Sequence, residues 1–395
     1  MITRTNKIGI FLILLSLSVE NKTFLNYTFA GIGPGDIGVL CGLACLFWGN
    51  HKFSYNMNKV QKYTFIMLSG GAIVLAFSII EGYQFNYMVA DVRNYIFLVA
   101  AYILFRDTDG AKEYVQRVIP WLALVNCLVF LSQANYFVGS FVREIYTPLW
   151  VSVLAVGCIL LGKTPITPIK YAIVLISIIS IIISETRSYI FPVVIITVCY
   201  LFIAVREKRL GSVIAVLSVV VLAYWYFKNL GMIEKISKRM NGSFGAESTM
   251  WLRFENAFIQ LKKMNFRQWI TGRGFGERIL VFQYDGSLRE TSDLEMVCFN
   301  QIIEFGLPLF IYNFFYSVVN AYKGFRVSRS YVFLISTLGI MMGGFVSGLA
   351  GSWGSIIVGM LMGMLGHESK RLFRNRNMQQ DVVTAVRYKC VVKNE

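Results

Sequence analysis

Long apolar runs separated by short polar connections make up most of the chain. Each run has the length and composition of a membrane-spanning helix, although several are short unless they are tilted or extended into their flanks. The pattern predicts an all-α polytopic membrane protein with about twelve transmembrane helices. The predicted runs are 8–19, 36–48, 63–80, 88–105, 118–130, 149–161, 172–183, 189–205, 212–227, 297–319, 331–349 and 355–365.

One long stretch, residues 228–297, interrupts this pattern because it is polar and charged. It contains an amphipathic segment at 249–263, a glycine-rich turn at 271–276 and an acidic segment at 292–295. No Pro/Gly-rich or polar linker divides the apolar part, so residues 1–395 are predicted to form a single integral membrane domain. The 228–297 stretch is then a large loop of that domain.

Composition agrees with a membrane location. Of 395 residues, 56% are hydrophobic and only 15% are charged, whereas a soluble domain has about a quarter charged residues. The net charge of +16 would suit a nucleic-acid partner, but most basic residues lie in short loops and the C-terminal tail. That distribution is an orientation signal, so no nucleic-acid partner is expected.

The basic residues alternate between connections. One set of loops is basic, around residues 52–62, 163–170, 206–209, 323–329 and 370–376, and the other short loops are nearly neutral. The positive-inside rule therefore predicts that both termini are cytoplasmic and that 228–297 lies outside the cytoplasm. The apolar run at 8–19 follows Arg4 and Lys7 as in a signal peptide, but no clear cleavage site follows, and it is interpreted as the first membrane helix.

Metal and cofactor chemistry has little support in the sequence. The seven cysteines are scattered without a CxxC pair, and the two histidines, His51 and His367, fall in predicted cytoplasmic loops. Cys41 and Cys45 share a helix face without a nearby histidine or carboxylate. No metal site and no cofactor are predicted.

Arg187 lies in a tight connection, residues 184–188, between two apolar runs on the predicted outer side. Short outer loops are depleted in arginine. One interpretation is a side chain that extends to the lipid headgroups. The other is a fixed two-pronged donor for a phosphate group at the membrane surface.

The segment 249–263 is predicted to be an amphipathic helix that lies along the membrane or packs on the bundle. Its apolar face is formed by Trp251, Phe254, Phe258 and Leu261, and Arg253, Gln260 and Lys263 fall away from that face. Arg253 lies near the start of this helix among aromatic residues. The simpler alternative is a surface helix with a solvated polar face.

The glycine turn, with Gly272, Gly274 and Gly276, is not a dinucleotide fingerprint because no strand is predicted before it. It is interpreted as a tight turn after the helix. The alternative is a backbone nest that presents Arg273 to an anion.

Carboxylates on the predicted outer side are candidate bases. Ser292 and Glu295 have capping-box spacing and on one interpretation only start the next helix; Asp293 is not needed for that box. Asp91 and Arg93 lie near the outer start of their helix, where Arg93 is either functional or paired with a carboxylate of a neighbouring helix.

The order of these features resembles the superfamily of bacterial O-antigen polymerases and O-antigen ligases. The similarity spans about residues 172–320 and rests on Thr-Arg-Ser at 186–188, Trp-Leu-Arg-Phe-Glu-Asn-Ala at 251–257, the Gly-x-Gly turn, and Asn-Gln-Ile-Ile-Glu-Phe-Gly-Leu-Pro-Leu-Phe at 300–310. The resemblance implies a GT-C-like glycosyltransferase of the bacterial cytoplasmic (inner) membrane. Its partners would be membrane lipid, undecaprenyl-diphosphate-linked oligosaccharides as donor and acceptor, and a chain-length-regulating co-polymerase.

Residue roles follow from the same resemblance. Arg187 and Arg253 match the arginines that hold the diphosphate, with Arg273 and Arg93 as further candidates for that contact. Asp293 is the first candidate for the base that activates the acceptor hydroxyl, followed by Glu295 and Glu185.

Three functions remain after this comparison. Ligases of the superfamily carry a histidine near the end of the large loop, and residues 290–295 contain none, which favours a polymerase. A ligase that transfers glycan to another acceptor is one alternative. A flippase for lipid-linked oligosaccharide is another, although charged residues lining a central path would be expected for it.

Overall fold

The computed structural model describes most of the chain, and the structural statements below refer to those residues. They are 2–19, 33–50, 59–133, 149–162, 167–184, 187–208, 249–282, 287–291, 297–328 and 355–367, with single positions between 211 and 229. The predicted run at 331–349 lies outside them. The run at 212–227 is described only at single positions.

Helices account for 84% of the described residues, which agrees with the predicted helical membrane class. Four of these helices are long and apolar enough to cross a membrane, namely α3, α4, α5 and α8. Five shorter apolar helical segments accompany them in the described part. The helices before residue 210 are α1 (Arg4–Val19), α2 (Pro34–Gly49), α3 (Lys59–Ile80), α4 (Phe85–Asp107), α5 (Ala111–Gln133), α6 (Trp150–Leu160), α7 (Pro168–Ile183) and α8 (Arg187–Arg206).

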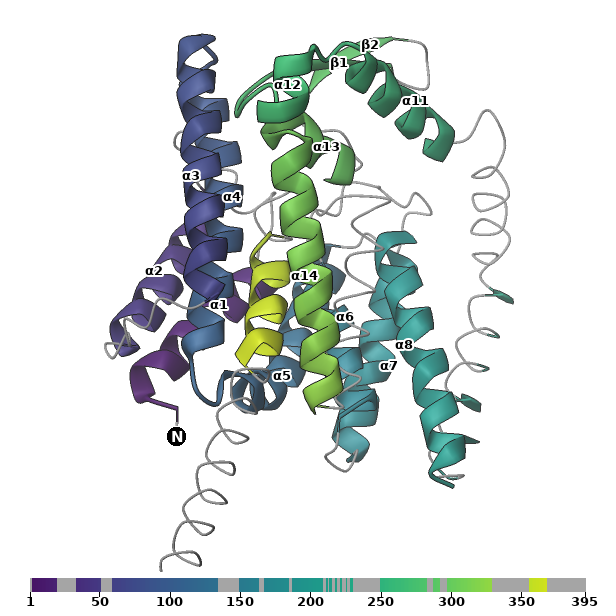
Figure 1. Ribbon diagram of the computed structural model, residues 1–395. Helices are drawn as coiled ribbons and strands as arrows, with labels where there is room; N and C mark the ends of the chain where they lie inside the picture. The colour runs from purple at the N-terminus through teal and green to yellow at the C-terminus, as the bar shows by residue number, and fades with distance from the viewer. Residues whose placement is uncertain are drawn as a thin grey trace, which may run out of the picture.

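The later elements include two strands that were not predicted. They are α11 (Thr249–Lys262), α12 (Phe266–Thr271), β1 (Ile279–Phe282), β2 (Leu288–Thr291), α13 (Val297–Phe305), α14 (Leu307–Ser328) and the helix Ser355–His367. The strands form an antiparallel pair in which Ile279 is opposite Thr291 and Phe282 is opposite Leu288. We refer to α11, α12, β1, β2 and α13 as the crown, because they lie together at one end of the molecule (Figure 1).

Helices α1 and α2 form a closely packed antiparallel pair, at the lower left of Figure 1. A Cβ atom at Gly9 would lie 2.7 Å from the carbonyl oxygen of Gly42, and one at Gly42 would lie 2.7 Å from that of Gly9. One at Gly38 would lie 2.1 Å from Ser16 Oγ. Small residues of this kind let two membrane helices approach until their backbones touch.

Side-chain contacts bring several helix ends to the end of the bundle opposite the crown. Asn6 Nδ2 donates to Asn50 Oδ1 (2.9 Å), and Asn50 Nδ2 donates to Thr108 Oγ1 (2.8 Å). His367 Nδ1 lies 2.8 Å from the carbonyl oxygen of Arg106. The first described helix begins and the last described helix ends on this side of the bundle. The predicted topology and the compartment of both termini stay predictions.

The predicted helix 297–319 is instead two helices. The backbone breaks at Gly306, whose φ is 82°, so that α13 belongs to the crown and α14 descends along α3 (Figure 1). A Cβ atom at Gly306 would lie 2.2 Å from the carbonyl oxygen of Ile270. The apolar pattern alone does not reveal this break, because both helices carry apolar faces.

Aromatic stacking fixes α14 against the bundle. The rings of Tyr63 and Tyr316 stack with centroids 4.1 Å apart, and Tyr63 Oη donates to Asn313 Oδ1 (2.8 Å). The Tyr102 and Tyr316 hydroxyls lie 2.9 Å apart. These contacts join α3, α4 and α14 below the crown.

Candidate functional site

The glycine turn, residues 272–276, is the point where the crown meets the bundle. Gly272, Gly274 and Gly276 have φ angles of 75°, 115° and 83°, a region that suits glycine and few other residues. Their added Cβ atoms would lie 2.1 Å from Glu304 O, 2.6 Å from Ser78 Oγ and 2.7 Å from Met88 N, respectively. Each position therefore favours glycine for two reasons, the positive φ angle and the lack of room for a Cβ atom. The predicted tight turn is present, but it follows α12, a short helix that was not predicted, and not the amphipathic helix at 249–263 directly.

All five backbone amides of this turn donate to acceptors within the protein. The acceptors belong to α12, α13, α3 and α4, so the turn joins segments far apart in the sequence. The bonds are Gly272 N to Gln268 O (2.8 Å), Arg273 N to Ile303 O (2.6 Å), Gly274 N to Glu304 O (3.3 Å), Phe275 N to Ser78 Oγ (2.7 Å) and Gly276 N to Asp91 Oδ2 (2.7 Å). The alternative of an open backbone nest for an anion does not fit these contacts, since no amide of the turn remains to donate.

Arg273 turns inward and ties the glycine turn to α11. Its side chain is 7% exposed, Nη2 donates to Gln260 O (2.7 Å), and Nη1 donates to Glu277 Oε1 (3.0 Å) and to Gln260 Oε1 (3.3 Å). A buried guanidinium needs such a carboxylate partner to offset its desolvation. The predicted contact of Arg273 with a diphosphate stays a prediction, and in the structure this side chain holds the crown together.

The buried face of α11 differs from the predicted apolar face. Leu261 is buried as expected, but Trp251 and Phe258 are exposed, and Gln260, predicted to point away, is 2% exposed. The reason lies in β1, whose outer edge would otherwise leave backbone groups without partners. Asn256 exchanges two 2.9 Å hydrogen bonds with Phe282, and Gln260 Nε2 donates to Leu280 O (2.8 Å).

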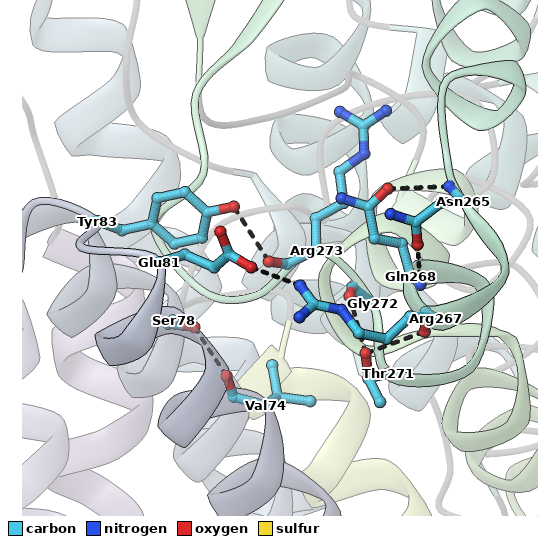
Figure 2. Close-up of polar contacts among 10 residues, drawn as sticks. All are labelled: Val74, Ser78, Glu81, Tyr83, Asn265, Arg267, Gln268, Thr271, Gly272 and Arg273. Atoms are coloured by element: carbon cyan, nitrogen blue, oxygen red, sulfur yellow. Dashed lines mark hydrogen bonds and ion pairs between the residues drawn. The ribbon is translucent and has the colours of Figure 1, made fainter.

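The connection between α3 and α4 contacts the crown from the side of the bundle. Figure 2 shows Tyr83 and Glu81 reaching from that connection toward the glycine turn and α12. Tyr83 Oη donates to Arg273 O (3.2 Å), and Glu81 Oε1 accepts from Arg267 Nη2 (2.5 Å). Mainly through burial, and then through the nearby Glu277 and Glu81 carboxylates, the pKa of Tyr83 rises to about 12, so its hydroxyl stays a donor.

Glu277 has an environment that the sequence did not reveal. Burial raises the pKa of this carboxyl above its usual range, with Arg273 opposing the rise. Its Oε1 atom holds Arg273, while Oε2 is buried and has no hydrogen-bond partner among the described residues. The only signal in the sequence is its position directly after the last glycine of the turn.

Arg278, the next residue, was also missed. Its guanidinium lies over the ring of Tyr87, with Cζ 3.5 Å from the ring centroid. Tyr87 belongs to the first turn of α4. This stacking restricts the orientation of the guanidinium plane, and the Nε atom is buried without a hydrogen-bond partner among the described residues.

Arg93 makes the ion pair that was considered for it, and its predicted contact with a diphosphate stays a prediction. Its Nη1 donates to Asp36 Oδ2 on α2 at 2.6 Å, so it pairs with a carboxylate of a neighbouring helix. Asp91 instead accepts from the glycine turn. Their separate directions agree with a spacing of two residues, which places side chains on different faces of a helix.

The remaining predicted site residues are described only in part. Arg253 lies on α11 and is half-buried. Arg187 is the first residue of α8, right after the tight connection from α7, but its side chain is outside the described residues. Glu185, Asp293 and Glu295 also lie outside them. The structure therefore leaves their predicted roles untested.

Metal binding finds no support in the described part of the chain, where no group of three or more His, Cys, Asp or Glu residues is arranged to hold an ion. The site is instead a set of arginines, carboxylates and tyrosines where the crown meets α3 and α4.

No protein-family model matches this chain, and no curated protein matches it either.

Proposed function

We propose that this protein polymerises oligosaccharide repeat units carried on undecaprenyl diphosphate, at the outer face of a bacterial cytoplasmic membrane. The proposed architecture is GT-C-like, with about twelve membrane helices, both termini cytoplasmic and the crown outside. The reaction moves a growing glycan from its lipid diphosphate to the next lipid-linked repeat. The glycosidic bond to the diphosphate breaks as the acceptor hydroxyl forms the new bond and loses its proton.

The observation that best supports this proposal is where the charged side chains of the crown lie. Arg253 and Arg267 belong to the crown, and Arg278 directly precedes its strand β1. The crown is fixed to the ends of α3 and α4 by the glycine turn. In Figure 1, α8, which begins with Arg187, starts on this same side of the bundle. A substrate with its lipid in the membrane and its sugars outside would present its diphosphate at this height.

The assignment of residues within this reaction follows from charge. Arg187 and Arg253 stabilise the negative charge that develops on the leaving diphosphate, which is the largest single catalytic effect available without a metal. Asp293 accepts the proton of the acceptor hydroxyl, with Glu295 and Glu185 as the next candidates. The diphosphate leaving group supplies the free energy, so neither a nucleotide nor a metal is required.

The decisive experiment gives purified protein lipid-linked single repeats, with EDTA present and no nucleotide. Chain lengthening, seen by mass spectrometry of extracted lipids, is the expected result. In a deletion strain, surface glycan should shrink to zero or one repeat while lipid-linked single repeats accumulate outside. Long polymer left on undecaprenyl diphosphate would point to a ligase, and single repeats trapped on the cytoplasmic face would point to a flippase. No lengthening by folded protein on verified substrate would refute the proposal.

Variants test the individual roles. Arg187→Ala and Arg253→Ala should each abolish lengthening at normal protein levels, and Arg187→Lys should restore little, because a point charge does not replace a planar fork. Asp293→Asn should slow turnover while substrate binding is largely retained. Normal glycan from either alanine variant would exclude the proposed contact with the diphosphate.

A further inference from the structure

Three arginines surround the place where the crown meets α3 and α4, and they differ in their partners. Arg267 pairs with Glu81 at 2.5 Å, and Arg273 pairs with Glu277 at 3.0 Å. Arg278 forms no ion pair with any residue that the structure describes. Its guanidinium instead makes a cation–π contact with the ring of Tyr87. Two further carboxylates lie at the turn, but Asp91 accepts from Gly276 N and Glu304 accepts from Asn300 Nδ2. Of the three guanidiniums, Arg278 is therefore the one that is not paired with a carboxylate of the described residues.

The stacking on Tyr87 prepares this guanidinium for a ligand. A cation over an aromatic face keeps its charge while the ring restricts its orientation. Its Nε is buried without a hydrogen-bond partner among the described residues, so the end of the plane with Nη1 and Nη2 is the part assigned to a bidentate contact, the arrangement that matches the oxygens of a phosphate group. A freely moving surface arginine would lose more conformational entropy on forming the same bonds.

The first turn of α4 adds to the positive potential. It contains no acidic residue, and the side chain of Gln84, which precedes the helix, makes no capping hydrogen bond. The partial positive charge at the start of this 23-residue helix is therefore not neutralised by a carboxylate of its own turn. Tyr87 brings Arg278 directly against that turn.

The height of Arg278 suits a membrane-anchored ligand. Thr108 lies at the level where several helices end opposite the crown. Tyr87 is 21 residues earlier on the same helical path, so a rise of 1.5 Å per residue separates the two levels by about 30 Å, the thickness of the hydrocarbon core. Tyr87 and Arg278 thus lie at the depth of the headgroups, where tyrosine is enriched.

We propose that Arg278 binds a phosphate-class anion at the membrane surface, namely the diphosphate of the second lipid-linked substrate. The anion site is argued from the structure alone, whereas the identity of its ligand rests on the polymerase function proposed above. A polymerase handles two lipid diphosphates at once. Arg187 and Arg253 are assigned to the one that leaves, so the acceptor's diphosphate needs a separate cation.

The test measures binding rather than activity. Full-length protein in phosphatidylcholine nanodiscs is titrated with undecaprenyl diphosphate, and in parallel with phosphatidylglycerol and with inorganic diphosphate, by microscale thermophoresis. Arg278→Gln should weaken binding of undecaprenyl diphosphate by roughly tenfold to a hundredfold, the usual loss for a charge-assisted contact. The matched control is Arg289→Gln, which removes the same charge from the exposed strand β2; it should bind as the wild type does.

Two further variants guard against misfolding. Arg278→Lys keeps the charge without the planar fork and should recover only part of the affinity. Tyr87→Leu keeps Arg278 and removes its support, so it should weaken binding less than Arg278→Gln does. Thermal transitions and gel filtration confirm that each variant is folded.

The outcomes separate the claims. Loss confined to undecaprenyl diphosphate supports the proposal as stated. Equal loss for phosphatidylglycerol would overturn the acceptor assignment and identify the ligand as an ordinary anionic headgroup. Unchanged binding of all three probes by folded Arg278→Gln would overturn the anion site itself. Failure of the lengthening reaction described above would refute the polymerase function without changing any of these binding results.

Discussion

Replacing Gly272 by alanine should release the crown from the bundle. This glycine has a φ of 75°, and a Cβ atom there would lie 2.1 Å from the carbonyl oxygen of Glu304. That carbonyl belongs to backbone at the end of α13, so it cannot rotate away as a flexible side chain would. The methyl group can be accommodated only if the turn and α13 separate.

The cost has two parts. Gly272 has a ψ of 179° at its positive φ, a region almost confined to glycine, and alanine there costs about 1–3 kcal/mol. Separation also stretches the bonds from Arg273 N to Ile303 O and from Gly274 N to Glu304 O, each worth about 1 kcal/mol. The sum is about 3–5 kcal/mol, which corresponds to a change of roughly two to four powers of ten in the equilibrium constant for opening.

Gly82 offers a matched control in the connection between α3 and α4. Its φ is 74°, and an added Cβ atom meets nothing within 4 Å. Gly82→Ala therefore carries the conformational cost of about 1–2 kcal/mol without the steric one. The difference between the two variants reports the contact with Glu304 together with the glycine-only ψ of 179° at Gly272.

Hydrogen exchange followed by mass spectrometry reads this difference locally, because exchange rates of protected amides report the free energy of opening. Peptides covering 272–276 should exchange about a hundredfold faster or more in Gly272→Ala, and far less so in Gly82→Ala. Equal exchange in both variants would refute the reasoning, since it would show that the close contact with Glu304 does not hold the turn in place.

Three more predictions address orientation, pH and helix packing. A cysteine at Ser287 in a cysteine-free background should react with an impermeant thiol reagent in intact cells, whereas one at Ser328 should not; the reverse pattern would overturn the assigned sides. Because burial raises the pKa of Glu277, its contribution to stability is largest below the ordinary glutamate pKa and is lost as pH rises through the raised one. Glu277→Gln should therefore flatten the pH dependence of the thermal transition across the mildly acidic range, and an unchanged profile would contradict the shift. Gly42→Val should lower the melting temperature, because the backbone contact with α1 would have to open; an unchanged melting temperature would show that the pair adapts without cost.

The sequence predicted those features whose physical cause is local. Helix α11 was anticipated to within a residue at its end, because its amphipathic period is a property of the segment itself. The burial of Gln260 was not, because it depends on the open edge of a strand that is distant in the sequence and weakly marked. The break at Gly306 was missed for the same reason, since it is needed only where Ile270 approaches.

The candidate site could likewise be predicted only in its local features. Charged residues outside the apolar runs could be identified, but their partners could not. Pairing distinguishes Arg273, held by Glu277, from Arg278, held by Tyr87. The first pairing follows from the fold of the turn against α11 and the second from its packing on α4, and no periodicity encodes either.

The glycines at 272 and 306 have a mechanical consequence for the whole protein. A Cβ atom at Gly306 would lie 2.7 Å from Gly272 N, so the two backbones meet without an intervening side chain. Near its middle, α14 is stacked through Tyr316 against Tyr63 of α3. If α14 changes its tilt to match a thinner or thicker bilayer, the direct backbone contact between Gly306 and Gly272 would pass that motion on to the crown. If the crown lies outside the membrane as proposed, the acyl-chain length of the surrounding lipid would therefore change its distance from the bilayer.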